Sequence, residues 1–381
     1  MKLVPLSFGL AAAAAGIAAY PALSAPSYDS QAPIAYMVDL NSGAVLYSRD
    51  ADKRIPPASM AKMMTVYTVF DMVKDGEVSL DRRITMPEEI WKKWNNQGST
   101  MFLKIGDKPT VAELLHGIIT LSGNDACVLL ATGVSGSEKA FTDRMNEKAK
   151  ELGLTNSHFG TSMGWPDEGR TYVSAQDLAT IARATIEDFP KLYKQFYGQE
   201  KFTWGGITQD NRNPLMGKVE GADGLKTGHT EEAGYGFTGS AVQDGRRLVM
   251  VVAGLDSYGG RISESTNFMD WGFDAWDSRA LFAKGASVGE AKVQMGSERS
   301  VALVAPQKLG VAYPAGTNAK VEASIRYDGP VKAPIEKGQR IASLVVKTGG
   351  GEQELPLVAG ESVSEAGVFS RTWNGFMSLF D

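Results

Sequence analysis

The sequence predicts an α+β fold in which helices pack on an antiparallel sheet, followed by a small all-β domain. Three observations carry this prediction. Apolar side chains recur at helical spacing after Pro57, apolar and polar residues alternate over a long stretch that ends near Leu255, and helical patterns stop after about Gly285. A chain of 381 residues is also too long for one ordinary core, which favours two domains, over residues 30–285 and 286–362.

Composition places the chain among soluble globular proteins. It is 43% hydrophobic and 22% charged, which disfavours disorder. A formal net charge of -5 and the absence of Lys/Arg runs argue against a nucleic-acid partner. The single cysteine, Cys127, allows no internal disulfide and is interpreted as a packed core thiol. No metal or other cofactor is expected, because no carboxylate or cysteine lies at ligand spacing from His116, His158 or His229.

The first 25 residues have the pattern of a secretory signal peptide. Lys2 is the only charge before an apolar stretch that runs to about Leu23, and the small residues Ser24 and Ala25 follow. Such a segment is removed from the mature protein, which is then exported. The alternative is an uncleaved membrane anchor, which the prolines and weakly apolar alanines of this segment disfavour.

The predicted first domain opens with a hairpin and a buried helix. Ile34–Asp39 and Ala44–Ser48 flank the turn sequence Leu-Asn-Ser-Gly, as two paired strands would. Two prolines then end the extended segment, and a helix with Ser59 in its first turn follows. Its apolar residues, at helical spacing, are Met60, Met63, Met64, Tyr67 and Phe70.

Three more helices are expected before the sheet. Thr110 and Glu113 form a capping-box pattern that opens a helix ending near Leu121. The turn sequence Ser-Gly-Asn separates this helix from a second one, for which Asp125 is the expected cap. The third helix begins at Ser174.

The sheet is predicted from a run of three antiparallel strands. Residues 224–230 form the first strand, and residues 234–243 form the second. The chain turns at Asp244-Gly245 and returns as an apolar strand to Leu255. A helix near Ser263–Phe273 closes the domain.

Residues 286–362 are predicted to be all-β, because short strands alternate there with Gly and Pro turns. The expected strands lie around Val301–Val304, Lys320–Arg326, Arg340–Lys347 and Glu354–Val358. Residues 366–381 are predicted to form an amphipathic helix whose apolar face suits a membrane surface, with docking on the β domain as the alternative. That face carries Phe369, Trp373, Phe376, Met377 and Phe380.

Ser59 and Lys62 form a Ser-x-x-Lys pattern, which brings a hydroxyl and an amine to one face of a helical turn. A serine becomes a nucleophile when a base takes its proton, and a desolvated, unprotonated lysine can be that base. By itself, however, the pattern is better explained by a helix cap followed by a surface lysine.

Two further patterns favour a catalytic role for Ser59 and Lys62 over a helix cap and a surface lysine. Ser122 and Asn124 place a second hydroxyl and an amide on a turn between helices. Residues 226–228, Lys-Thr-Gly, add a positive charge and a hydroxyl on a strand, where the glycine would let a substrate backbone approach. A second Lys-Thr-Gly, at residues 347–349, has no reactive serine in its own domain and is interpreted as a hairpin turn. Together, the three patterns in this order are specific.

With these motifs the chain resembles the low-molecular-mass penicillin-binding proteins of the D-alanyl-D-alanine carboxypeptidase family, which are serine peptidases. The similar segments are "PPASMAKMMT", "LSGNDACVLLA", "NRNPL" and "GLKTGHTEEAGYGF", all in family order. The resemblance is specific over about residues 30–285. It implies a β-lactamase/transpeptidase-like fold with a β-sandwich-like second domain. It further implies a terminal helix that rests on the periplasmic face of the bacterial inner membrane.

The resemblance also implies a mechanism. The enzyme would remove the terminal D-alanine from a peptidoglycan stem pentapeptide through an acyl-enzyme, in cell wall biogenesis and the control of cell shape. Ser59 is the implied nucleophile, Lys62 the general base and Ser122 the proton relay to the leaving D-alanine. A β-lactam antibiotic would acylate the same serine as a substrate mimic. The implied substrate-binding residues are Asn124, Lys226, Thr227, Gly228, His229, Arg247 and Arg212.

Some of these residues have individual implied roles. Backbone N–H groups of Ser59 and His229 would form the oxyanion hole, and Lys226 and Thr227 would bind the terminal carboxylate. Arg247 and, with less support, Arg212 would add positive charge there. Another arginine, Arg261, is interpreted as structural.

Three other functions remain open from the sequence. A murein D,D-endopeptidase of the same fold would carry the same motifs. A β-lactamase needs a Glu-x-x-Leu-Asn deacylation loop, which the sequence near Glu151 resembles with the wrong spacing. A non-catalytic wall-binding scaffold is disfavoured by the presence of all the reactive side chains.

Overall fold

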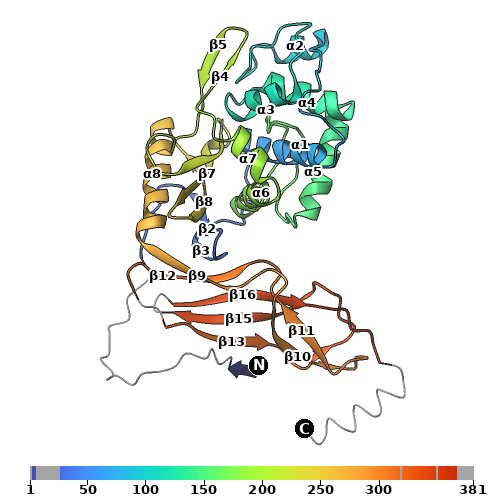
Figure 1. Ribbon diagram of the computed structural model, residues 1–381, viewed down its shortest axis with the longest axis vertical. Coiled ribbons are helices and arrows are strands. Elements are labelled where there is room, and N and C mark those ends of the chain that lie inside the picture. The colour runs from blue at the N-terminus through green and yellow to red at the C-terminus, as the bar shows by residue number, and fades with distance from the viewer. Residues whose placement is uncertain (1, 6–25, 318–319, 349–350, 367–381) are drawn as a thin grey trace, which may run out of the picture. The chain divides into compact units, whose positions relative to one another are not determined.

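The computed structural model describes residues 2–5, 26–317, 320–348 and 351–366. The chain divides into two compact units (Figure 1). The larger unit comprises Tyr28–Leu40 and Leu46–Phe273, and the smaller unit comprises Met1–Ser27, Asn41–Val45 and Asp274–Asp381. The predicted terminal helix, and most of the predicted signal peptide, lie outside the described residues.

The larger unit contains a five-stranded sheet in the order β3-β2-β8-β7-β6. The predicted run of three strands is confirmed, since β6, β7 and β8 pair antiparallel in sequence. Asp244 and Gly245, between β7 and β8, both have positive φ angles, as a tight hairpin turn requires. The strands are β2 Ile34–Asp39, β3 Val45–Arg49, β6 Ala222–Thr230, β7 Gly234–Gln243 and β8 Arg246–Leu255. A separate hairpin is formed by β4 Lys201–Trp204 and β5 Ile207–Asp210.

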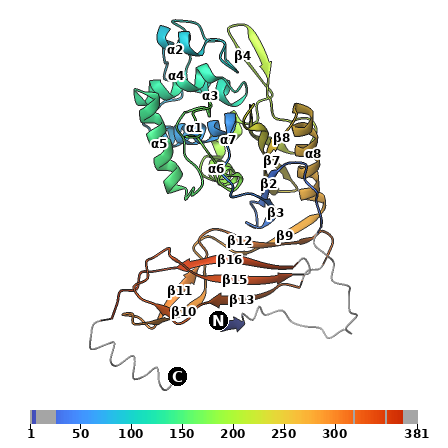
Figure 2. The same cartoon turned by 180° about the vertical axis from the view of Figure 1, so that it is seen from behind.

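Helices cover both faces of this sheet, with α8 on one side and α1 and α6 on the other (Figures 1 and 2). Helix α6 contacts β2, β8 and α1. On the opposite face, Gly272 of α8 lies against Met37 and Leu248 of the sheet. The helices are α1 Lys62–Lys74, α2 Glu88–Trp94, α3 Val111–Ile119, α4 Asn124–Ser135, α5 Glu138–Glu151, α6 Ala175–Asp188, α7 Pro190–Phe196 and α8 Tyr258–Asp274. None of the helices in the described part of the chain is long and apolar enough to cross a membrane.

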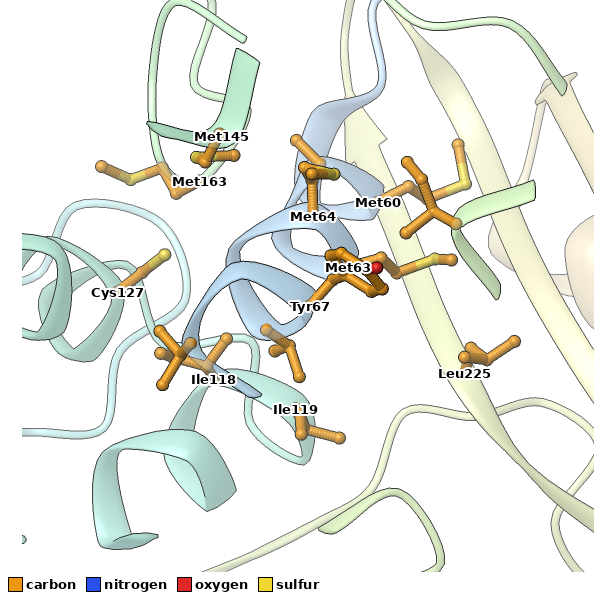
Figure 3. Close-up of a cluster of buried hydrophobic side chains, with 14 of the residues drawn as sticks. Met60, Met63, Met64, Tyr67, Ile118, Ile119, Cys127, Met145, Met163 and Leu225 are labelled. Atoms are coloured by element: carbon orange, nitrogen blue, oxygen red, sulfur yellow. The ribbon is translucent and has the colours of Figure 1, made fainter. Parts of the chain in front are cut away.

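Helix α1 forms the centre of the core, because side chains from all around it are buried. Figure 3 shows its methionines and Tyr67 surrounded by α3, α4, the segment carrying Met163, and β6. Met63, Met64 and Phe70 are fully buried. A helix that is apolar on every side is stable only inside such a cluster. The one charged side chain in its first turn, Lys62, therefore enters an apolar environment.

The starts of the helices partly match the sequence predictions. Thr110 and Glu113 form the predicted capping box, and the Ser174 side chain caps α6. The prediction for Asp125 is wrong: α4 begins after Gly123, and the buried Asp125 carboxylate also accepts hydrogen bonds from the loop before α3. The prediction for Ser59 needs correction too. It lies in a 3₁₀ turn, η1 (Ala58–Ala61), that precedes α1.

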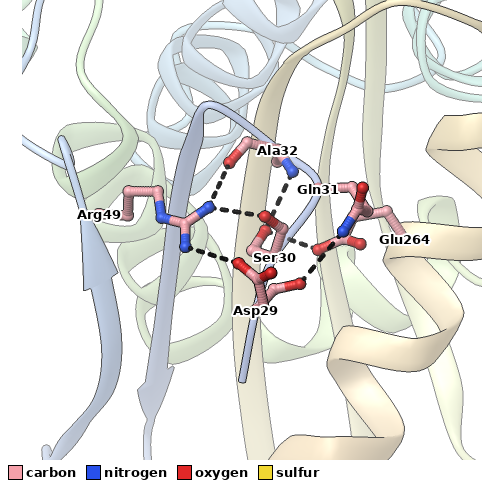
Figure 4. Close-up of polar contacts among 6 residues, drawn as sticks. All are labelled: Asp29, Ser30, Gln31, Ala32, Arg49 and Glu264. Atoms are coloured by element: carbon pink, nitrogen blue, oxygen red, sulfur yellow. Dashed lines mark hydrogen bonds and ion pairs between the residues drawn. The ribbon is translucent and has the colours of Figure 1, made fainter. Parts of the chain in front are cut away.

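A buried polar network ties the edge of the sheet to α8 (Figure 4). The Ser30 hydroxyl donates to the Glu264 carboxylate over 2.6 Å, and Arg49 donates to the Ser30 carbonyl over 2.6 Å. Glu264 is 3% exposed. A buried carboxylate of this kind is tolerated only when hydrogen-bonded, so the network fixes the chain before β2.

The smaller unit has a sheet in the order β1-β13-β15-β16-β11-β10-β14 and a core of its own. It begins earlier than predicted, because residues after Asp274 form β9, which pairs with β12. The strands of this unit are β1 Lys2–Pro5, β9 Trp276–Phe282, β10 Ser287–Gln294, β11 Ser300–Val304, β12 Leu309–Pro314, β13 Glu322–Tyr327, β14 Val331–Lys332, β15 Arg340–Thr348 and β16 Gly351–Ala359. Thr348 pairs with Gly351, so the second Lys-Thr-Gly copy lies at a hairpin, as predicted.

Candidate active site

Ser59 lies at a cavity of about 470 Å³ in the larger unit. The turn that presents it is strained, since the preceding Ala58 has a φ of +47°. Strained backbone is concentrated at functional sites, where surrounding structure holds it in place. The cavity is lined by Ser59, Gly98, Ser99, Ser122, Asn124, Met163, Gly164, Trp165, Arg212, Thr227, Gly228, His229, Thr230, Tyr235, Tyr258 and Arg261.

The Lys62 amine contacts the Ser59 hydroxyl. Its Nζ lies 2.8 Å from Ser59 Oγ, 2.8 Å from Asn124 Oδ1 and 3.1 Å from the Met163 carbonyl oxygen. Three acceptors match the three N–H groups of an ammonium, whereas a neutral amine would accept the serine proton along the same 2.8 Å contact. Burial lowers the pKa of Lys62 to about 8, and the charge of Arg212 adds to the effect. The amine is therefore suited to act as a base.

Ser122 and Asn124 reach the cavity from the turn between α3 and α4. Ser122 has a φ of +63°, a left-handed conformation that is uncommon outside glycine. Asn124 begins α4, and its side chain bridges two elements: Oδ1 accepts from Lys62, and Nδ2 donates to the Gln97 carbonyl over 3.0 Å. The turn therefore holds the amide against the lysine and leaves the hydroxyl on the cavity wall.

Strand β6 forms another wall of the cavity. It is the edge strand of the sheet, so one side of its backbone is open to a substrate. Thr227, Gly228 and His229 line the cavity, and the His229 ring stacks on Tyr235 with centroids 3.9 Å apart. Packing gives a reason for glycine at position 228 in addition to the predicted approach of a substrate. A Cβ there would lie 2.7 Å from the carbonyl oxygen of Pro57, so glycine lets β6 pack against the turn that carries Ser59.

Lys226 lies behind this wall, 3% exposed, with Nζ donating to the Thr227 carbonyl over 3.0 Å. Burial lowers the pKa of Lys226 well below its usual range, and the charges of Lys62, Arg212 and Arg261 lower it further. The cavity itself is lined by the guanidinium groups of Arg212 and Arg261, and no carboxylate is among its lining residues. Such a field favours an anionic ligand, for example a carboxylate.

One arginine predicted to bind substrate lies away from the cavity, and another arginine lines it instead. Arg247 does not line the cavity: its guanidinium donates to Asp223 over 2.7 and 2.9 Å and to Ser240 over 2.7 Å. Arg261, interpreted from the sequence as structural, lines the cavity instead, and Arg212 lines it as predicted. Arg261 Nη1 donates to the Gly228 carbonyl over 3.4 Å.

The comparisons with known proteins agree with this geometry. A sequence profile described as D-alanyl-D-alanine carboxypeptidase matches residues 21–257, and a profile described as penicillin-binding protein 5, C-terminal domain, matches residues 276–365. The chain belongs to the D-alanyl-D-alanine carboxypeptidase family. Its relatives in this family include D-alanyl-D-alanine carboxypeptidase DacA of Haemophilus influenzae, which is 36% identical over 89% of this chain and 86% of that protein. DacC of Escherichia coli is 36% identical over 95% of this chain and 91% of that protein.

Solved structures of penicillin-binding proteins match this chain, one over most of its length and one over a shorter part. Penicillin-binding protein 5 from Haemophilus influenzae matches with a TM-score of 0.73 and 35% identity, over 90% of this chain and 100% of that chain. Penicillin-binding protein D2 from Listeria monocytogenes, solved in an ampicillin-bound form, matches with a TM-score of 0.58 and 28% identity. That match covers 65% of this chain and 99% of the Listeria chain. The predicted α+β fold with a C-terminal all-β domain is confirmed.

Two other side chains with reactive groups, Cys127 and Glu151, do not line the cavity. Burial raises the pKa of the Cys127 thiol to about 11, and its Sγ donates to the Ser162 carbonyl over 3.1 Å, so it remains a packed thiol. Glu151, near the imperfect deacylation motif, is exposed at the end of α5 and pairs with Lys148. It is not among the residues that line the cavity.

Proposed function

We propose that the protein removes the terminal D-alanine from peptidoglycan stem pentapeptides through an acyl-enzyme on Ser59. One observation carries the proposal. Ser59 Oγ lies 2.8 Å from the amine of the fully buried Lys62, at a cavity whose other walls present a hydroxyl and cationic groups. A nucleophile, its base and a carboxylate-binding wall are the parts that hydrolysis of a C-terminal peptide bond requires.

In the acylation step, neutral Lys62 takes the proton of Ser59 while Oγ attacks the carbonyl carbon of the penultimate D-alanine. The charge that develops on the carbonyl oxygen is stabilised by the backbone N–H groups of Ser59 and His229. Close packing of β6 on η1 at Gly228 supports this role, because it brings the two backbones together.

The leaving D-alanine needs a proton and a bound carboxylate. Ser122 relays the proton from Lys62 to the departing amine, and Asn124 orients both Lys62 and the substrate amide. Thr227 on the cavity wall and Lys226, buried directly behind it, bind the terminal carboxylate, as the resemblance implies. Arg212 and Arg261 line the same cavity and add positive charge to it.

Water then hydrolyses the acyl-enzyme and returns the proton to the Ser59 oxygen. A β-lactam acylates the same serine, because its strained amide and carboxylate occupy the positions of the D-alanyl-D-alanine end. The Listeria relative solved in ampicillin-bound and cefotaxime-bound forms supports this extension.

The setting of the reaction is also part of the proposal. The signal-like pattern of residues 1–25 and the relatives among bacterial cell-wall enzymes support export to the periplasm after signal cleavage. The apolar face predicted for residues 366–381 supports peripheral attachment to the inner membrane. In that place the enzyme would act on newly made cell wall and influence cell shape.

The test is release of D-alanine from a stem pentapeptide that ends in D-Ala-D-Ala, with Ser59→Ala as the control. We expect release by the wild-type protein and none by the variant. If cross-linked dimers are cut and the pentapeptide is not, the protein is an endopeptidase. If neither is cut and no penicillin adduct forms, the proposed chemistry is wrong.

A further inference from the structure

A second cavity, of about 550 Å³, lies in the larger unit and takes no part in the proposed chemistry. Three aromatic side chains and an exposed isoleucine shape it: Trp91 of α2, Phe102 of the loop that follows α2, and Trp204 and Ile207 of the β4–β5 hairpin. Phe102 and Ile207 are 43% and 45% exposed. We call this cavity the aromatic groove. Its other lining residues are Asn95, Leu103, Lys104, Asp107 and Gly205.

The groove adjoins the catalytic cavity, because one loop lines both. Gly98 and Ser99 lie on the catalytic side, and Phe102 lies on the groove side of the same loop. Phe102 follows Gly98 by four positions, so their Cα atoms are within about 14 Å of each other. The hairpin is also fixed to this loop, since Gln209 Nε2 donates to the Thr100 carbonyl over 3.3 Å.

Phe102 is held outward by its neighbours. The buried Asp125 carboxylate accepts hydrogen bonds from the backbone N–H of Met101 over 2.8 Å and of Leu103 over 3.1 Å. Both of these neighbours are buried, and Phe102 between them has a φ of +62°. A bulky residue in this region of φ is an outlier that surrounding structure must maintain. The ring is therefore fixed toward solvent.

The chemistry of the groove suits a neutral sugar ring. Aromatic faces pack against the C–H faces of a pyranose, and polar groups around them bond its hydroxyl and acetamido groups. Here the aromatic side chains are accompanied by Asn95, Lys104 and Asp107, whose charges balance. This contrasts with the catalytic cavity, whose charged lining residues are cationic. The volume is in the range of small-ligand sites rather than of a protein interface.

We propose that the aromatic groove binds an N-acetylated sugar of the glycan strand whose stem peptide occupies the catalytic cavity. This rests on the proposed function, because the peptide must enter at Ser59 with its sugar-bearing end directed away. Four peptide residues lie between the scissile bond and the sugar of a pentapeptide, which is roughly 14 Å of extended chain. That length is enough to span the distance of up to about 14 Å that the shared loop allows between Gly98 and Phe102.

The experiment compares two substrates on the full chain: a stem pentapeptide without sugar and the same pentapeptide joined to its N-acetylated disaccharide. The variants are Phe102→Ala and Trp204→Ala, which remove aromatic faces from two separate elements. The control is Ile105→Ala, which removes an apolar side chain that is 51% exposed but does not line the groove. The readout is kcat/KM from D-alanine release, with the rate of penicillin acylation measured in parallel.

We expect each groove variant to lose about tenfold in kcat/KM for the disaccharide substrate, mainly through KM, as is usual for a truncated aromatic contact. The sugar-free pentapeptide, the rate of penicillin acylation and the Ile105→Ala control should remain at wild-type values. Equal loss on both substrates, or no loss on either, would overturn the proposal, and the second result would direct attention to a protein or lipid ligand. Failure of the wild-type protein to release D-alanine from both substrates contradicts the proposed function instead.

Discussion

The proposed chemistry depends on Lys62 as its base. Its side chain, on the first residue of α1, is fully buried, yet its amine contacts the hydroxyl of Ser59 and the amide oxygen of Asn124. Burial is what lowers its pKa, and the same burial keeps water from competing for the amine. The apolar surroundings that stabilise α1 thus also favour the neutral form of the Lys62 amine.

The pKa of Lys62, about 8 rather than 10.5, predicts the pH dependence of acylation. The reactive form is the neutral amine, and its fraction grows about tenfold per pH unit below the pKa. The rate constant for acylation by penicillin should therefore rise between pH 6 and 8 and level off above about 8. Stopped-flow acylation across pH 6 to 9 measures this. A flat profile over that range would show that Lys62 is not the base.

The presence of Arg261 at the cavity wall, and the absence of Arg247 from it, gives a second prediction. Arg261→Gln removes a cation from the cavity wall, so we expect kcat/KM for the pentapeptide to fall by about tenfold or more. Arg247→Gln breaks the ion pair with Asp223 outside the cavity and should lower the melting temperature while kcat/KM stays within about twofold. If Arg247→Gln weakens catalysis more than Arg261→Gln does, the assignment of the two arginines is reversed.

Residue types and their order were enough to predict which side chains would lie together at the candidate site. Ser59, Ser122, Asn124 and Thr227 line one cavity although they are far apart in sequence. Which arginine lies beside them could not be predicted. The alternation of side chains along a strand shows which face of the sheet a residue is on, but not how far along the strand the cavity lies. Arg247 pairs with Val242, at the end of β7 remote from the cavity residue Tyr235.

At the scale of elements, the helical spacing of apolar residues predicted α1, α3 and α6. The same spacing could not predict the 3₁₀ turn at Ser59. That turn depends on contact with β6, where Gly228 lies against Pro57 and Met60. Likewise, Asp125 looks like a helix cap in sequence and instead bonds a loop that only the folded chain brings near. Local patterns do not carry information about such tertiary partners.

The network around Glu264 yields a prediction for stability. Ser30→Ala removes the hydroxyl that donates to this buried carboxylate, which should lower the free energy of unfolding by about 1–3 kcal/mol. Gln31→Ala is the matched control, because its side chain is exposed one residue away. Urea unfolding of both variants measures the difference. Equal midpoints for Ser30→Ala and the control would contradict a structural role for the network.

At the scale of the whole molecule, the chain has two units with separate cores. The sequence predicted the all-β character of the smaller unit but missed β1, β9, β10, β12 and β14. Its strand order joins segments that are distant in sequence, such as β11 with β16. Short strands with weak alternation do not show which partner they will take.

The separate cores predict that the larger unit works alone. A shortened chain of residues 26–275 should fold and form a covalent penicillin adduct at a rate within about threefold of the full chain, since each core is closed within its unit. The Listeria relative supports this expectation, because 99% of its chain matches only 65% of this one. Circular dichroism and adduct formation test it. A shortened chain that is folded but cannot be acylated would mean that the smaller unit contributes to the reaction.

The central claim is that Ser59 is the acylated nucleophile, and intact-protein mass spectrometry after incubation with penicillin tests it most directly. The account predicts one added penicillin mass, mapped by peptide digestion to the segment that contains Ser59 and absent from Ser59→Ala. An adduct that persists in Ser59→Ala, or that maps to Ser122 or Cys127, would contradict it.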